Sequence, residues 1–102
     1  MNKMPTTHTV LRAASRVTDI SVNLITSASR VAHIVLIRDA CAAISKQHLC
    51  QTDRVIARAL RRDRSSVSMA IGRHKKRMVD NTYYQTLVKA IEDESGISIA
   101  NS

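Results

Sequence analysis

Aromatic residues and helix-breaking residues are scarce in this chain of 102 residues. It contains no Phe, no Trp, two Tyr, two Gly and one Pro. Any core must therefore be aliphatic, built from Ile, Val, Leu, Ala and a few Met, and a domain of this size has modest stability. Few Gly and Pro, together with many Ala, Arg and Leu, favour an all-helical chain. No stretch alternates apolar and polar residues over enough positions to indicate a strand.

Cysteines and long apolar runs are also few. The two cysteines, Cys41 and Cys50, do not make a disulfide framework, so we expect reduced thiols in a cytosolic protein. No apolar secretory segment is visible at the N-terminus. The apolar run at residues 34–37 is far too short to span a bilayer. These absences predict a cytoplasmic protein that has no membrane partner.

Acidic residues are nearly missing from one third of the chain. Residues 54–77 hold nine Lys and Arg against a single acidic residue, Asp63. Their net charge of +8 therefore equals the net charge of the whole chain. A basic block of this kind indicates a polyanionic partner.

The apolar spacing predicts one domain of five to six helices over residues 6–94, between flexible tails at 1–5 and 95–102. The expected helices cover about 6–17, a short segment capped by Ser21, 31–47, a short segment capped by Thr52 or Asp53, a segment that starts near Arg64, and a last one capped by Asn81 or Thr82. Gly96 suits the C-terminal stop of the last helix. The inward faces are expected to carry Val10, Ala13, Ala14 and Val17; Ile34, Ile37, Cys41 and Ile44; Val67, Ala70, Ile71 and Met78; and Tyr84, Leu87, Val88 and Ile91.

Within residues 53–77, a short helix, a three-residue turn and a second helix with a polar front make the pattern of a helix-turn-helix. Ala57 is small enough for two helices to cross closely beside it. The residues expected to pack the helix pair are Ile56, Leu60, Val67 and Ile71, whereas Ser65, Ser66, Ser68 and Met69 are left for the other face. Arg61 stands where such a turn usually has Gly, and a positive φ there would be strained.

Other chemistry is poorly supported by the sequence. The spacings among His33, His48, His74, Cys41 and Cys50 match no zinc pattern, and Cys41 falls on a buried stripe. No serine lies in a strand-turn-helix elbow, so we expect no enzymatic activity. Tyr84 belongs to an apolar stripe and is expected in the core, with Tyr83 partly exposed. The alternatives that remain are a non-specific nucleic-acid-binding module and a helical protein-interaction module.

Two segments resemble a known family. Residues 62–67, RDRSSV, are similar to the R-D-H-T-T-V signature in the C-terminal DNA-binding domain (domain IV) of the bacterial replication initiator DnaA. Residues 20–45, ISVNLITSASRVAHIVLIRDACAAIS, resemble without gaps that family's I-S-V-x-D-L-L-S-x-S-R-x-x-x-I-V-x-x-R-Q-I-A-M-Y-L-A segment. The resemblance covers about residues 10–77. It implies an all-helical domain with a Trp-repressor-like helix-turn-helix.

The resemblance also implies roles for individual residues. Arg30 matches a loop arginine that the family inserts into the minor groove, and Lys46 matches a lysine that contacts phosphate. Residues 63–66 match the run that reads the major groove and grips the backbone. Arg38 matches an arginine on the long helix, where Asp39 replaces the usual Gln. Together with the charge pattern, this predicts DNA contacts for Arg30, Arg38, Lys46, Arg54, Arg62, Asp63, Arg64, Ser65, Ser66, Ser68, Met69, Arg73 and Lys75.

The chain departs from the family in several ways. Arg64 replaces His, one residue is missing around the turn, and Ala28, Val31 and Ala32 stand where basic residues are common. The sequence has no G-x-x-x-x-G-K-[ST] phosphate-binding loop. We therefore expect a stand-alone, nucleoid-associated regulator of transcription or replication that binds specific double-stranded DNA. We expect it to need no ATPase activity, metal, cofactor or small-molecule substrate.

Overall fold

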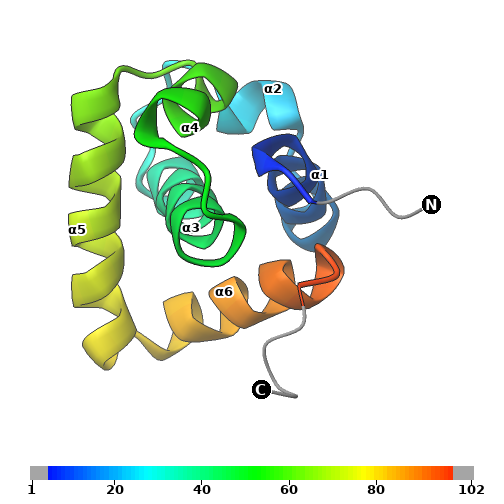
Figure 1. The fold of residues 1–102 in the computed structure, drawn as a ribbon. Coiled ribbons are helices and arrows are strands. Elements are labelled where there is room, and N and C mark those ends of the chain that lie inside the picture. The colour runs from blue at the N-terminus through cyan, green and yellow to red at the C-terminus, as the bar shows by residue number, and fades with distance from the viewer. Residues whose placement is uncertain (1–4, 98–102) are drawn as a thin grey trace.

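Six helices make up the part of the chain that the computed structural model describes, residues 5–97 (Figure 1). They are α1 (Thr7–Thr18), α2 (Val22–Ile25), α3 (Ala32–Leu49), α4 (Asp53–Leu60), α5 (Arg64–Asp80) and α6 (Thr82–Glu94). Residues 5–97 contain no strand. The all-helical fold predicted from the sequence is therefore confirmed.

Short polar side chains fix where most of the helices begin. Ser21, Thr52 and Asn81 each accept a hydrogen bond from the backbone N–H three residues further on, which satisfies a donor that has no partner within the helix. These are three of the caps expected from the sequence. Thr6 caps α1 in the same way, and the Thr9 side chain in turn accepts from the Thr6 N–H.

Helix α3 occupies the centre of the molecule. In Figure 1 it is viewed nearly end-on, with α5, α4, α1 and α6 around it. Its residues from Ile37 to Ser45 are all buried, and the predicted stripe of Ile34, Ile37, Cys41 and Ile44 is confirmed as part of the core. A helix that is covered on all sides has no solvent face on which to place charge. The one acidic side chain in this stretch, Asp39, is therefore unusual.

The remaining core is aliphatic except for Tyr84, the largest fully buried side chain. All four residues expected on the inward face of α6 are buried, namely Tyr84, Leu87, Val88 and Ile91. Tyr83 is exposed, as expected. Val17 and Met78 were expected on inner faces, but their side chains are 37% and 38% exposed. Both lie in the last turn of a helix.

The C-terminal end of α6 closes with Gly96, whose φ of 78° suits a residue without a Cβ. Ser95 is buried and Ile97 packs against the core, so both belong to the folded domain rather than to the predicted tail 95–102. The rest of that tail, residues 98–102, lies outside the described residues. So do residues 1–4 of the predicted N-terminal tail.

Candidate nucleic-acid interface

The turn between α4 and α5 consists of three residues, as the sequence predicts. Arg61 ends α4 in the left-handed conformation, with φ 58° and ψ 44°. The Arg62 N–H donates to the Ala57 carbonyl at 2.8 Å, which is the bond that closes a Schellman motif. A left-handed residue with a Cβ costs about 1–2 kcal/mol, so the turn is strained at the position where Gly is more usual.

Asp63 caps the N-terminus of α5. Its Oδ1 accepts from the Ser66 N–H at 2.8 Å and from the Ser65 hydroxyl at 2.8 Å. These hydrogen bonds, above all the one from the Ser66 N–H, lower the pKa of the Asp63 carboxyl. The carboxylate thus orders the first turn of α5, and within residues 5–97 no ion pair joins it to Arg64.

The first half of α5, residues 64–72, has one inward and one outward face. Val67 and Ala70 are buried against the core, as predicted. The residues exposed on the outward face are Arg64, Ser65, Ser68, Met69 and Gly72. Serine is short, so the helix backbone on this face is accessible to a large partner.

The loop between α2 and α3 is held in place by Arg38. The Nε atom of this buried arginine donates to the Ile25 carbonyl at 2.9 Å. One terminal nitrogen donates to the carbonyls of Ser27 and Ser29, at 2.9 and 3.1 Å. Burial, followed by the neighbouring Arg62 guanidinium, lowers the pKa of Arg38. The sequence predicted DNA contact for Arg38; the structure places its guanidinium on backbone carbonyls of this loop.

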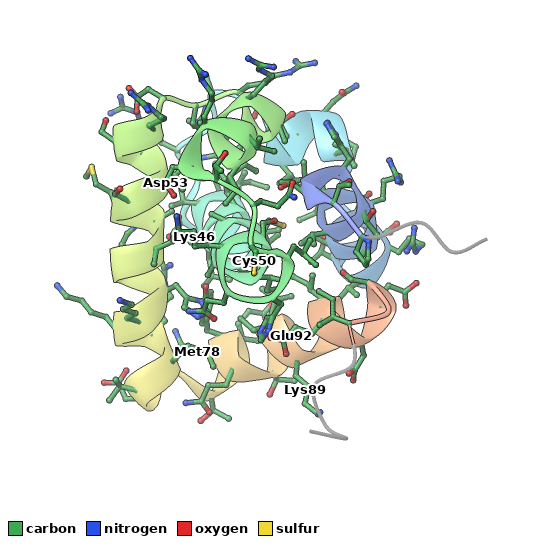
Figure 2. All side chains as sticks on the ribbon, in the orientation of Figure 1. Lys46, Cys50, Asp53, Met78, Lys89 and Glu92 are labelled. Atoms are coloured by element: carbon green, nitrogen blue, oxygen red, sulfur yellow. The ribbon has the colours of Figure 1, made fainter. Side chains whose placement is uncertain are left out.

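Arg62 joins this loop to the turn before α5. Its guanidinium donates to the Ser27 carbonyl, the same oxygen that Arg38 binds. Arg30, three residues along the loop, is exposed. The loop and the turn both lie along the upper edge of Figure 1, and Figure 2 shows several nitrogen-tipped side chains extending from that edge. We refer to Arg30, Arg62, Arg64, Ser65, Ser68 and Met69 as the loop–turn–α5 surface.

The second half of α5, residues 73–80, is tied to α3 by a buried carboxylate. Asp39 has no exposed surface, and its two oxygens accept from the Arg73 Nε and a terminal Arg73 nitrogen at 2.8 and 2.9 Å. The Arg77 guanidinium donates to Asp39 at 2.6 Å. Its carbon atom lies 5.3 Å from the centre of the Tyr84 ring, a cation–π distance. The Tyr84 hydroxyl in turn lies 2.7 Å from the buried His74 Nδ1.

This network was not foreseen from the sequence, which predicted a DNA contact for Arg73. Asp39 and Arg73 are separated by 34 residues, so no local pattern connects them. A signal was nevertheless present: a charged residue inside the apolar stretch 34–44 must be paired when it is buried. The hydrogen bonds on Asp39 are the dominant cause of a raised pKa for Arg73, so this guanidinium remains charged.

The other predicted contacts lie away from the turn. Lys46, near the end of α3, forms an ion pair of 2.8 Å with Asp53, the first residue of α4 (Figure 2). Arg54 is exposed beside it in sequence, and Lys75 is exposed on the second half of α5. The predicted residues brought together at the loop and the turn are therefore Arg30, Arg62, Asp63, Arg64, Ser65, Ser66, Ser68 and Met69.

Neither cysteine belongs to the loop–turn–α5 surface. Cys41 is buried in the core, and burial raises its pKa to about 12, which keeps the thiol protonated. Cys50 ends α3 in the left-handed backbone conformation and is exposed.

Among residues 5–97, no three His, Cys, Asp or Glu side chains are grouped so as to hold a metal ion. In the same range, no helix combines the length and the apolar character that a membrane span requires.

Comparison with known proteins gives no relative. The chain matches no family model, no curated protein and no solved structure. The resemblance to the DNA-binding domain of DnaA therefore stays a prediction from the sequence.

Proposed function

We propose that this chain binds double-stranded DNA in a sequence-specific way through the loop–turn–α5 surface. The observation that carries the proposal is the double use of the Ser27 carbonyl, which binds both Arg38 and Arg62. Because of this link, the loop that carries Arg30 and the start of α5 form one preorganised surface. A rigid surface loses little conformational entropy when it binds.

Helix α5 suits the major groove, which admits one α-helix. Arg64 is the first residue of the helix and is exposed. The serines that follow it are short enough for the helix backbone to approach base edges. A guanidinium binds guanine O6 and N7 with two parallel hydrogen bonds, whereas the His that the DnaA family has here is shorter. We therefore propose Arg64 as a base-reading residue and guanine as its base.

We propose that Arg30 supplies a contact outside the major groove. An exposed arginine on a neighbouring loop suits a narrow minor groove, where A·T-rich sequence attracts cations. The cavity of about 80 Å³ between α3, the turn and α5 is lined by the Asp39 carboxylate as well as by Arg38, Arg62 and Arg73. These arginines already bind carbonyl or carboxylate oxygens of the chain, so the cavity is not proposed as a phosphate site.

The biological role that fits these features is regulation of transcription or replication, in the manner of a DnaA-like helix-turn-helix domain acting without nucleotide hydrolysis. The sequence resemblance and the placement of residues 62–66 at the start of α5 support this role. A pure sample should show no protein-dependent ATP hydrolysis. Measurable hydrolysis that persists after further purification would contradict this part of the proposal.

The decisive experiment is selection of preferred sites from a random duplex pool, followed by binding measurements over a range of salt concentrations. We expect a defined sequence to be enriched and affinity to fall steeply with salt, because each phosphate contact releases counterions. Enrichment of no sequence, with tight binding to any duplex or to RNA, would indicate non-specific nucleic-acid binding. Absence of binding to any nucleic acid would leave a protein partner as the alternative.

A further inference from the structure

Met69 is the exception on the exposed face of the first half of α5. Of the five residues exposed between positions 64 and 72, three are polar, one is Gly72, and only Met69 is apolar. The side chain of Met69 is 62% exposed, so it contributes little to the core. It lies one turn after Ser65, within the loop–turn–α5 surface.

Gly72 leaves open space beside Met69. It lies three positions further along α5, on the same side of the helix. A Cβ added at Gly72 would meet nothing within 4 Å, so no neighbour in the protein requires the missing side chain. Its φ is not positive either, and a glycine inside a helix is less stable than an alanine at the same position. The space next to Met69 is therefore open to a partner outside the chain.

The chemistry of Met69 identifies what it would contact. In the major groove the base edges present hydrogen-bond donors and acceptors and one apolar group, the 5-methyl of thymine. A methionine side chain is unbranched and flexible, so it adjusts to an apolar group whose position is set by other contacts. We propose that Met69 is a specificity-determining residue that packs against a thymine 5-methyl in the major groove. This inference rests on the DNA binding proposed above.

The test uses the duplex selected by this chain and replaces each thymine in turn by deoxyuridine, which lacks only the methyl group. At one thymine we expect the substitution to weaken binding by the wild-type chain about fourfold, because burying one methyl or methylene is worth about 0.8 kcal/mol. The Met69→Ala variant should bind the unmodified duplex more weakly and should not respond to deoxyuridine at that position. Val79→Ala is the matched control, because Val79 is 79% exposed near the end of the same helix.

Each outcome decides the inference. Equal sensitivity to deoxyuridine in the wild type and Met69→Ala overturns it, as does a selected site in which no thymine responds. A loss of the response in Val79→Ala as well as in Met69→Ala also overturns it, because the effect would then not belong to Met69. These results would leave the proposed DNA binding intact, whereas failure to bind any duplex overturns both.

Discussion

The basic side chains in the two halves of α5 have different partners. In the first half, residues 64–72, Arg64 is exposed and pairs with no acidic side chain of the described residues. In the second half, residues 73–80, Arg73 and Arg77 both bind Asp39, which is fully buried. The first half is thus free to meet a partner, and the second half fixes the helix to α3.

This difference teaches that net charge in a sequence overstates the charge available to a ligand. Residues 54–77 carry all of the net charge of the chain, yet two of their arginines are committed to one carboxylate from α3. A buried ion pair of this kind is costly to break, because removing one partner leaves a buried charge without compensation. Arg73 and Arg77 therefore hold α5 in place, whereas Arg64 is available to a partner.

The largest expected effect is on stability and comes from Asp39→Asn. The substitution removes the charge that Arg73 and Arg77 share, and we expect it to lower the free energy of unfolding by about 3 kcal/mol. Denaturant-induced unfolding measures this. The matched control is Asp53→Asn, which breaks the exposed pair with Lys46 and should cost about 1 kcal/mol or less. Equal losses in the two variants would contradict the anchoring role of Asp39.

The next effect is on affinity and distinguishes base reading from backbone contact. Arg64→Ala should cost about 1–3 kcal/mol of binding to the selected duplex and relax the preference at one base pair. Lys75→Ala should instead weaken binding to all sequences and flatten the salt dependence, as a phosphate contact does. Fluorescence anisotropy with the selected duplex and single-base variants measures both. If Arg64→Ala weakens every sequence equally, Arg64 is a phosphate contact.

Gly72→Ala separates stability from binding on the exposed face of α5. Because the added Cβ meets nothing in the protein, the variant should gain about 0.5–1 kcal/mol of stability. We expect its affinity for the selected duplex to fall, because the methyl occupies space that the partner uses. A variant that is more stable and binds DNA as well as the wild type would show that the partner does not approach this part of the helix.

The smallest expected effect is a pH dependence from His74. Burial is the main cause that lowers the pKa of this imidazole, with Arg77 among the further contributors. The folded protein therefore binds fewer protons than the unfolded chain, so stability is full above the unfolded pKa of about 6.5 and declines as pH falls below it. Thermal unfolding between pH 7.5 and 5 checks this. In His74→Asn, which cannot titrate, the decline should be smaller; an unchanged decline would assign it to other groups.

Most of the helices could be predicted because their signals are local. Apolar spacing and the caps Ser21, Thr52 and Asn81 lie within a few residues of the structure they determine. The turn at residues 61–63 was also predicted, although Arg61 is strained there. The fold class follows from the same local signals, since few residues in the chain interrupt a helix.

The part of the site that could not be predicted depends on contacts between distant residues. Arg38 and Arg73 were both expected at DNA because each belongs to a basic pattern. In the structure the Arg38 guanidinium binds loop carbonyls at least nine positions away in sequence, and Arg73 binds a carboxylate 34 positions away. Whether an arginine faces a partner or the protein depends on which acceptors the fold brings near it, and the charge pattern does not contain that information.

The central claim is that the loop–turn–α5 surface reads the base sequence of the DNA, whereas the second half of α5 supplies phosphate contact only. Titration of the isotope-labelled chain with the selected duplex, followed through its backbone amide NMR signals, tests this most directly. We predict the largest changes in residues 28–31 and 62–72, with smaller changes over residues 76–80. Changes concentrated in α1 or α6, or equally large along the whole of α5, would contradict the claim.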